Sequence, residues 1–219
     1  MASSAAAAPA AAYILYLVTD AGLSRGRSHL SVVEAAIRGG VTIVQYREKS
    51  ASTRRMIEEA TELRRLCRTA GIPLIVNDRL DVALAVDADG VHVGQDDMPA
   101  SRARRLLGRK QILGVSAGSI EEARKAVDDG ADYIGASPVF STPTKPDAPP
   151  PLGIEGLRRM TQAVKIPVVA IGGITEGNAV TIMEAGAAGI AVVSAIVGAE
   201  DVEAAARALR AAVENVRTR

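Results

Sequence analysis

The chain has 219 residues, 48% of them hydrophobic and 23% charged, which suits one large domain with a full core rather than a disordered polymer. Its 26 Lys and Arg nearly balance 25 Asp and Glu, and only 2% of the residues are aromatic. This composition argues against a nucleic-acid-binding protein, which needs excess positive charge or aromatic stacking platforms. The single cysteine, Cys67, excludes a disulfide scaffold and a multi-cysteine zinc module.

The first twelve residues, MASSAAAAPAAA, form an Ala-rich, low-complexity segment. The first arginine is Arg25, so neither a secretory nor a mitochondrial signal fits this segment well. We expect residues 1–12 to be a disordered tail and residues 13–219 to be the catalytic domain. No apolar run approaches the roughly 20 residues that span a bilayer, so we expect a cytoplasmic protein that does not bind membranes.

From Ile14 onward, short apolar runs alternate with longer amphipathic stretches such as 54–70, which stops at Gly71. Most runs are rich in Val and Ile and lack regular alternation, as expected of buried parallel strands. Ser119 and Glu122 have the spacing of a capping box at the start of a helix. The eight runs cover residues 14–18, 41–45, 73–77, 90–94, 111–115, 132–136, 167–171 and 189–193.

Eight strand–helix units in about 207 residues predict a single-domain α/β protein, a (β/α)8 TIM barrel at the compact end of that fold's size range. A doubly wound open sheet is the alternative, but it usually has fewer strands, and no G-x-G-x-x-G motif follows the first run. In such barrels the chemistry lies on loops after the carboxyl ends of the strands. Candidate site residues are therefore sought there.

Cationic side chains follow the second predicted strand. Strand alternation places Gln45, Arg47 and Lys49 on one side, where an amide, a guanidinium and an ammonium group suit a polyanion. The alternative is an ordinary charged loop in which Arg47 pairs with Glu48.

Acidic side chains follow the third and fourth strands, where Asp78 and the pair Asp96 and Asp97 can converge because neighbouring strands lie only about 5 Å apart. Oxygen ligands without His or Cys companions suit Mg²⁺. The alternative is that these aspartates are helix N-caps. His92 lies within the fourth run, where we expect a packed, hydrogen-bonded histidine rather than a catalytic one.

The later strand ends offer hydroxyls and glycines. Ser116 follows the fifth strand, and a proline-rich loop at 137–151 after the sixth is long enough to be a lid rather than a surface insertion. Gly172 and Gly173 follow the seventh strand and Val193 and Ser194 the eighth; together they suit the recurrent barrel phosphate site, although Gly-Gly also makes plain turns.

Covalent catalysis is not expected from this sequence. Cys67 falls inside a predicted helix, and neither Ser116 nor Ser194 has an evident histidine partner. Two anion sites, one basic and linked to a metal and one built from backbone, indicate two phosphorylated substrates.

Read as an ordered set, these motifs resemble the thiamine-phosphate synthase (thiamine-phosphate pyrophosphorylase) family. The resemblance spans nearly the whole predicted domain. The matching strings are QYREK (45–49), VND (76–78), HVGQDD (92–97), GVS (114–116), TPTK (142–145), IGGI (171–174) and VVSAI (192–196).

The resemblance implies a Mg²⁺-dependent barrel enzyme that joins an aminopyrimidine diphosphate to a thiazole phosphate through a pyrimidine cation, releasing pyrophosphate. It places Mg²⁺ on Asp78 and Asp97, and catalysis on Arg47, Lys49, Ser116 and Lys145. The implied pyrimidine diphosphate contacts are Gln45, Tyr46, Arg47, Glu48, Lys49, Asn77, Ser116 and Lys145. The implied thiazole phosphate contacts are Thr142, Pro143, Thr144, Gly173, Val193 and Ser194.

Two departures from the family pattern are Ser137 and Ser141, where relatives often carry Gly and Pro. The alternative is a thiazole tautomerase or another phosphate-binding barrel isomerase. The related tautomerase would have a histidine at the position of Gly118, and such an isomerase needs a general base, for which the sequence offers only His92 or a carboxylate. A non-catalytic sensor of thiamine intermediates is a third interpretation, against which both Asp78 and Asp97 argue. An apolar helix face around 204–213 would suit a homodimer.

Overall fold

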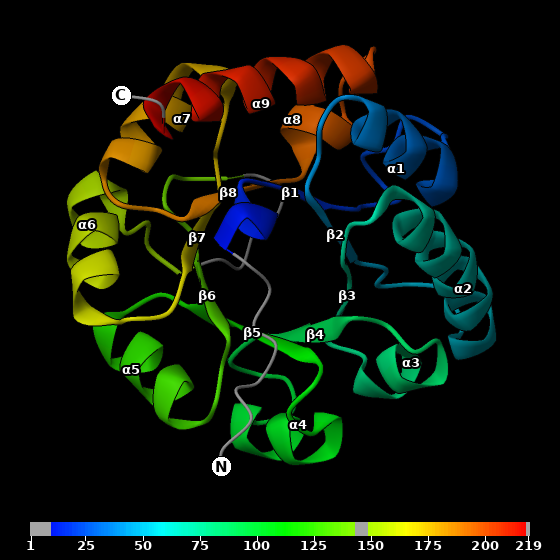
Figure 1. Ribbon diagram of the computed structural model, residues 1–219, viewed down its shortest axis with the longest axis horizontal. Coiled ribbons are helices and arrows are strands. Elements are labelled where there is room, and N and C mark those ends of the chain that lie inside the picture. Colours follow the sequence, from blue (N-terminus) through cyan, green and yellow to red (C-terminus); the bar gives the residue numbers. More distant parts are fainter. Residues whose placement is uncertain (1–9, 143–148, 218–219) are drawn as a thin grey trace.

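Eight parallel strands are paired in chain order and closed by pairing of the last with the first, and helices surround them (Figure 1). This computed structural model describes residues 10–142 and 149–217. The closed barrel confirms the predicted single-domain (β/α)8 fold and excludes the open sheet. The strands are β1 (Leu15–Val18), β2 (Ile43–Tyr46), β3 (Leu74–Asn77), β4 (Gly90–Val93), β5 (Ile112–Ala117), β6 (Tyr133–Ala136), β7 (Val168–Ile171) and β8 (Gly189–Val192).

Several helices begin at a short polar residue or end at a glycine. Ser52 accepts a hydrogen bond from the Arg55 N–H at the start of α2, and Gly71 ends that helix in the left-handed region with φ of 71°. The helices are α1 (His29–Arg38), α2 (Thr53–Ala70), α3 (Leu80–Ala85), α4 (Ala100–Leu107), α5 (Ile120–Asp128), α6 (Gly153–Ala163), α7 (Glu176–Glu184), α8 (Ser194–Val197) and α9 (Val202–Arg217). Within the described ranges, no helix combines the length and apolar character needed to cross a bilayer.

The predicted cap of α5 is present in a modified form. The Ser119 hydroxyl accepts from the Glu122 N–H at 3.1 Å, as the motif predicts. The Glu122 carboxylate reaches one residue further back than a capping box requires and accepts from the Gly118 N–H at 2.7 Å. The β5–α5 turn is thus fixed from both sides.

Strand alternation divides the apolar residues into two cores. On β1, Leu15 and Leu17 face the helices, whereas Tyr16 and Val18 face the inside of the barrel. The outer core lies between the strands and the helices, and the inner core fills the interior of the barrel, as in other barrels of this class. The inner residues are Tyr13, Tyr16, Val18, Ile43, Ile75, Ile112, Tyr133, Val169 and Ala191.

The domain begins earlier than the sequence indicates. Residues 10–13 form a short 3₁₀ helix, η1 (Ala10–Tyr13), which lies in the middle of the ring of strands (Figure 1). Tyr13 is fully buried there. The prediction of a disordered tail is therefore wrong for residues 10–12, because they belong to a 3₁₀ helix that brings the apolar ring of Tyr13 into the barrel interior. Residues 1–9 lie outside the described residues.

The apolar face of α9 is covered by its own chain. Ala206, Leu209 and Val213 are buried in the outer core, and α9 packs against α1 and α7. The prediction that this face serves a dimer is wrong, because a barrel helix uses its apolar stripe to cover the rest of its own fold.

Candidate active site

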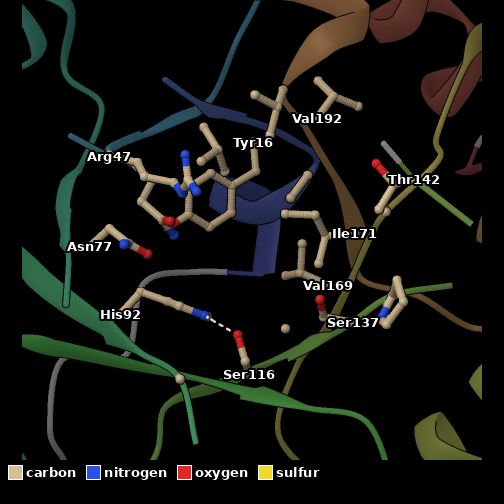
Figure 2. Close-up of a pocket in the computed structure, with 18 of the residues that line it drawn as sticks. Tyr16, Arg47, Asn77, His92, Ser116, Ser137, Thr142, Val169, Ile171 and Val192 are labelled. Carbon is tan, nitrogen blue, oxygen red and sulfur yellow. Dashed lines mark hydrogen bonds between the residues drawn. The ribbon is translucent and has the colours of Figure 1, made fainter. Parts of the chain in front are cut away.

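A cavity of about 410 Å³ opens among the residues that end the strands or follow them. Figure 2 shows Arg47 and Asn77 on one side of it and Thr142 and Ile171 on the other. The lining residues belong to every strand or to the segment that follows it. They are Tyr16, Val18, Gln45, Arg47, Lys49, Asn77, Asp78, His92, Gly94, Asp97, Ser116, Tyr133, Gly135, Ser137, Pro138, Thr142, Val169, Ile171, Gly172, Gly173, Ile174, Ala191, Val192, Val193 and Ser194.

The cationic group after β2 lies where strand alternation predicts. Gln45, Arg47 and Lys49 all line the cavity. Arg47 pairs with Asp20 at 2.6 Å rather than with Glu48, and Lys49 pairs with Asp78 at 2.6 Å. Both cations therefore face the cavity while held by a carboxylate, and the interpretation as an Arg47–Glu48 surface pair is excluded.

Asp78 and Asp97 come together beside Lys49. Burial, together with a hydrogen bond that protonated Asp97 donates to the neighbouring Asp78 carboxylate, raises the pKa of Asp97. Its Oδ2 accepts from the Gly94 N–H at 2.7 Å, so Asp97 braces its own loop. Asp78 adopts φ of 58°, a strained backbone conformation that Asp and Asn tolerate better than most residues.

Neither aspartate caps a helix. The N-cap of α3 is Arg79, without a side-chain cap, and the N-cap of α4 is Pro99. Asp96 is exposed, whereas Asp97 lines the cavity. Two neighbouring carboxylates with no capping role, where burial and Asp78 raise the pKa of Asp97, fit a divalent cation through oxygen ligands.

Tyr46 and Glu48 do not contribute side chains to this cavity. Tyr46 faces the helices, where its hydroxyl donates to Glu59 on α2 at 2.8 Å. Glu48 accepts from the Ser50 N–H and lines a second cavity of about 260 Å³. Both side chains lie away from the cavity because they alternate away from Arg47 and Lys49, and the substrate contacts that the family resemblance implies for these two residues stay a prediction.

A second cluster of potential ligands lies beside those two residues. Oxygen and nitrogen atoms of His29, Glu48 and Glu59 lie within 4.8 Å of one another. Their partners explain them without an ion: Glu59 accepts from Tyr46 and Arg55 and contacts His29 Nδ1 at 3.1 Å. The cluster ties α1 to β2 and α2.

The wall formed by β7 and β8 is less polar. Val169, Ile171 and Ala191 line it together with Val193 and Ser194. Gly173 has φ of 66°, and a Cβ there would lie 2.7 Å from the Cβ of Phe140, so only glycine fits this approach of the loops.

Part of the predicted thiazole phosphate site can be placed. Thr142, Gly173, Val193 and Ser194 line the same cavity, and Thr142 lies across it from Arg47 (Figure 2). Pro143, Thr144 and Lys145 lie outside the described residues.

His92 points into the barrel and is packed and hydrogen-bonded, as predicted. Its Nε2 lies 2.9 Å from Ser116 Oγ, which corrects the expectation that Ser116 has no histidine partner (Figure 2). The other ring nitrogen contacts the hydroxyl of Tyr133 at 2.8 Å, not a carboxylate. Burial lowers the pKa of His92 to about 4, so this pair lacks the basic imidazole of a nucleophilic Ser–His arrangement.

Sequence reasoning missed Tyr16 and Tyr133, which line the cavity, and Asp20, which pairs with Arg47. Asp20 follows β1 directly, so the rule used for the later strands would have found it. Tyr16 and Tyr133 lie within apolar runs, and alternation around inward-facing Val18 was the available signal for Tyr16.

The fold and the cavity define a class: a (β/α)8 barrel enzyme whose strand ends carry a cationic and acidic wall facing a glycine-bearing wall. A sequence-family model described as thiamine monophosphate synthase matches residues 15–196. The chain belongs to this family, whose members are transferases of thiamine biosynthesis.

Individual relatives agree with the family match. The chain is 70% identical over 199 residues to a thiamine-phosphate synthase from Chloroflexus aurantiacus, covering 91% of this chain and 92% of the relative. It is 56% identical over 198 residues to one from Syntrophomonas wolfei, with 90% and 95% covered. The thiamine phosphate pyrophosphorylase from Pyrococcus furiosus superposes with a TM-score of 0.88 at 45% identity, covering 94% of this chain and 98% of that one.

Proposed function

We propose that this protein joins an aminopyrimidine diphosphate to a thiazole phosphate, yielding thiamine phosphate and pyrophosphate. The observation that carries the proposal is the convergence of Asp78 and Asp97 beside Lys49 at one wall of the large cavity. Family membership supports the same reaction. We further propose that Asp78 and Asp97 hold Mg²⁺, which is consistent with their oxygen donors and with the raised pKa of Asp97.

Arg47 and Lys49 bind the diphosphate in this proposal. Both are paired with carboxylates that a ligand can replace, and an arginine can grip two phosphate oxygens at once. When bound, Mg²⁺ would offset negative charge on the departing pyrophosphate. Asn77 lines the cavity beside Asp78 and can donate to the same group, and Lys145 is proposed from the family motif alone.

The thiazole phosphate would occupy the opposite wall. Gly173, Val193 and Ser194 bring backbone and hydroxyl donors there, and the aliphatic side chains of Ile171 and Val169 provide an apolar surface for a thiazole ring. Thr142 lies at the same side (Figure 2). The two substrates would then face one another across the cavity.

A dissociative route fits this arrangement. Diphosphate leaves first with its bonding electron pair, the electron-rich aminopyrimidine carries the positive charge, and the thiazole nitrogen then attacks the exposed methylene carbon. The described cavity residues offer no basic serine–histidine pair, which favours a route without a covalent enzyme intermediate. Electron-withdrawing pyrimidine substituents should slow turnover, and insensitivity to them would indicate direct displacement.

The test is release of pyrophosphate by the purified protein, measured with both substrates, with each omitted in turn, and with and without Mg²⁺. We expect release only with the pyrimidine diphosphate, thiazole phosphate and Mg²⁺ together. Formation of a rearranged thiazole alone would support the tautomerase alternative. Tight binding without turnover would support the sensor alternative, and either result would overturn the proposal.

A further inference from the structure

Five polar side chains form one hydrogen-bonded chain across the inside of the barrel. Gln45 Nε2 donates to the Tyr16 hydroxyl at 3.0 Å, and the hydroxyls of Tyr16 and Tyr133 lie 2.8 Å apart. His92 continues the chain, with Nδ1 2.8 Å from the Tyr133 hydroxyl and Nε2 2.9 Å from Ser116 Oγ. The chain therefore runs between two predicted substrate contacts, Gln45 and Ser116.

The chain is buried, so its hydrogen bonds can be assigned a direction. Tyr16 and Tyr133 are each 1% exposed, and Gln45 and His92 are 5% and 8% exposed. Gly114 makes room for it, because a Cβ there would lie 2.2 Å from the ring of Tyr133. A buried hydroxyl without an acceptor is costly, so the hydroxyl protons of Tyr16 and Tyr133 must each go to a neighbouring member of the hydrogen-bonded chain.

The direction follows from the Gln45 end. An amide N–H only donates, so the Tyr16 oxygen accepts and its own proton goes to Tyr133. The Tyr133 proton then goes to His92 Nδ1, which leaves the neutral imidazole with its proton on Nε2. That N–H donates to Ser116 Oγ, so the Ser116 proton is directed to a partner outside the chain.

We propose that this chain fixes the polarity of two substrate contacts, making Gln45 an acceptor through its carbonyl oxygen and Ser116 a donor through its hydroxyl. The inference rests on the proposed function of the same site. Tyr16, Tyr133 and His92 are positioning residues in it, because they act through Gln45 and Ser116. All five line the cavity.

The aminopyrimidine diphosphate matches this polarity. Its exocyclic amine is its only N–H donor, and its ring nitrogens and phosphate oxygens are acceptors. The amine would donate to the Gln45 carbonyl, and Ser116 would donate to a ring nitrogen or a phosphate oxygen. An analogue with an oxo group in place of the amine sets two acceptors against each other and should be rejected.

The first experiment reads the direction itself by measuring ¹⁵N chemical shifts of the histidine ring nitrogens in the ligand-free protein. The protein has 2 histidines, and the variant His29→Gln therefore identifies the signals of His92. We expect the proton on Nε2 of His92. A proton on Nδ1 would mean that the chain runs the other way and would overturn the inference.

Two matched variants show whether the chain sets this state. Tyr133→Phe removes the hydroxyl that donates to His92, so the preference for Nε2–H should weaken. Tyr13→Phe is the control: its ring packs 4.9 Å from that of Tyr133, but its buried hydroxyl has no hydrogen-bond partner in the described structure. An unchanged His92 spectrum in both variants would contradict the proposed relay.

The second experiment compares binding of the aminopyrimidine diphosphate and its oxo analogue by calorimetry. We expect about tenfold tighter binding of the amine, a ratio that Tyr16→Phe reduces and Tyr13→Phe preserves. In turnover, Tyr16→Phe should raise KM for the pyrimidine substrate but not for the thiazole phosphate. Equal affinity for both pyrimidines overturns the inference and leaves the proposed reaction standing, whereas binding of neither overturns both.

Discussion

Ion pairs stand at both ends of the barrel, and their surroundings differ. At the amino-terminal end, Asp89 precedes β4 and accepts both from Arg64 at 2.9 Å and from the Leu74 N–H of β3 at 2.8 Å. Asp132 precedes β6 in the same way and accepts from Arg104 and from the Leu113 N–H of β5. Each carboxylate thus joins a helix to a strand backbone.

At the carboxyl-terminal end, the pairs Arg47–Asp20 and Lys49–Asp78 are also short, at 2.6 Å each. In the described structure, Asp20 accepts otherwise from Leu23 of its own loop, and neither carboxylate accepts from the N–H of a neighbouring strand. Arg47, Lys49 and Asp78 line the cavity, and Lys49 is 58% exposed. A ligand can replace one partner there without disturbing a strand. Pairs of a cation and an aspartate therefore stabilise the fold at one end of the barrel and are available for binding at the other. This is the usual division in (β/α)8 barrels, whose active sites lie at the carboxyl ends of the strands.

The sharpest way to separate the two ends is Asp78→Asn. Asparagine keeps the shape and tolerates φ of 58°, so the fold should persist. The loss of a charge from the proposed metal site should lower the rate of pyrophosphate release about 100- to 1,000-fold. Near-normal turnover at saturating Mg²⁺ would remove Asp78 from the proposed chemistry.

The opposite result is expected from Asp132→Ala at the other end. It leaves Arg104 and the Leu113 N–H without their shared acceptor and should lower the free energy of unfolding by about 2–4 kcal/mol. Denaturant unfolding measures this, and KM for both substrates should stay unchanged in the folded protein. Lys125→Ala, which breaks the exposed pair with Asp129, is the control and should cost less than about 1 kcal/mol.

A smaller effect should appear in the metal-free protein with Asp97→Asn. The folded state holds the Asp97 proton more tightly than the unfolded chain, because burial and Asp78 raise its pKa. That contribution is present at acidic pH and is lost as the pH rises through the raised pKa, so the parent should weaken relative to the variant above about pH 4.

The measurement is urea unfolding of both proteins across pH 3 to 7, roughly the range over which a carboxyl titrates. Mg²⁺ should then raise the melting temperature of the parent more than that of Asp97→Asn. A parent that gains stability over the variant with rising pH would contradict the pairing of the two carboxylates.

The smallest effect is expected from Asp20→Asn. The amide can still accept from the Leu23 N–H, as Oδ1 does at 3.1 Å, but it no longer competes with diphosphate for Arg47. We expect KM for the pyrimidine substrate to fall by about threefold, within the range of a single ion pair that water still reaches. A rise in KM would indicate that Asp20 orients Arg47 for the ligand instead.

The sequence alone determined the barrel and most of its rim. Buried parallel strands are continuous apolar runs, and each predicted run overlaps one observed strand, so the residues after them could be found by counting. Gln45, Arg47 and Lys49 share one side because a strand alternates every two residues, a purely local rule. Ser116, Gly173 and Val193 were found in the same way.

Closure of the barrel decided the rest, because it brings together residues that no local pattern relates. Tyr16 and Tyr133 are 117 positions apart, and their hydroxyls meet only because β1 and β6 face one interior. Tyr46 turned outward to α2, and the apolar face of α9 was covered by α1 and α7. Such partners depend on which surfaces the packed helices and strands bury, and burial is a property of the whole fold.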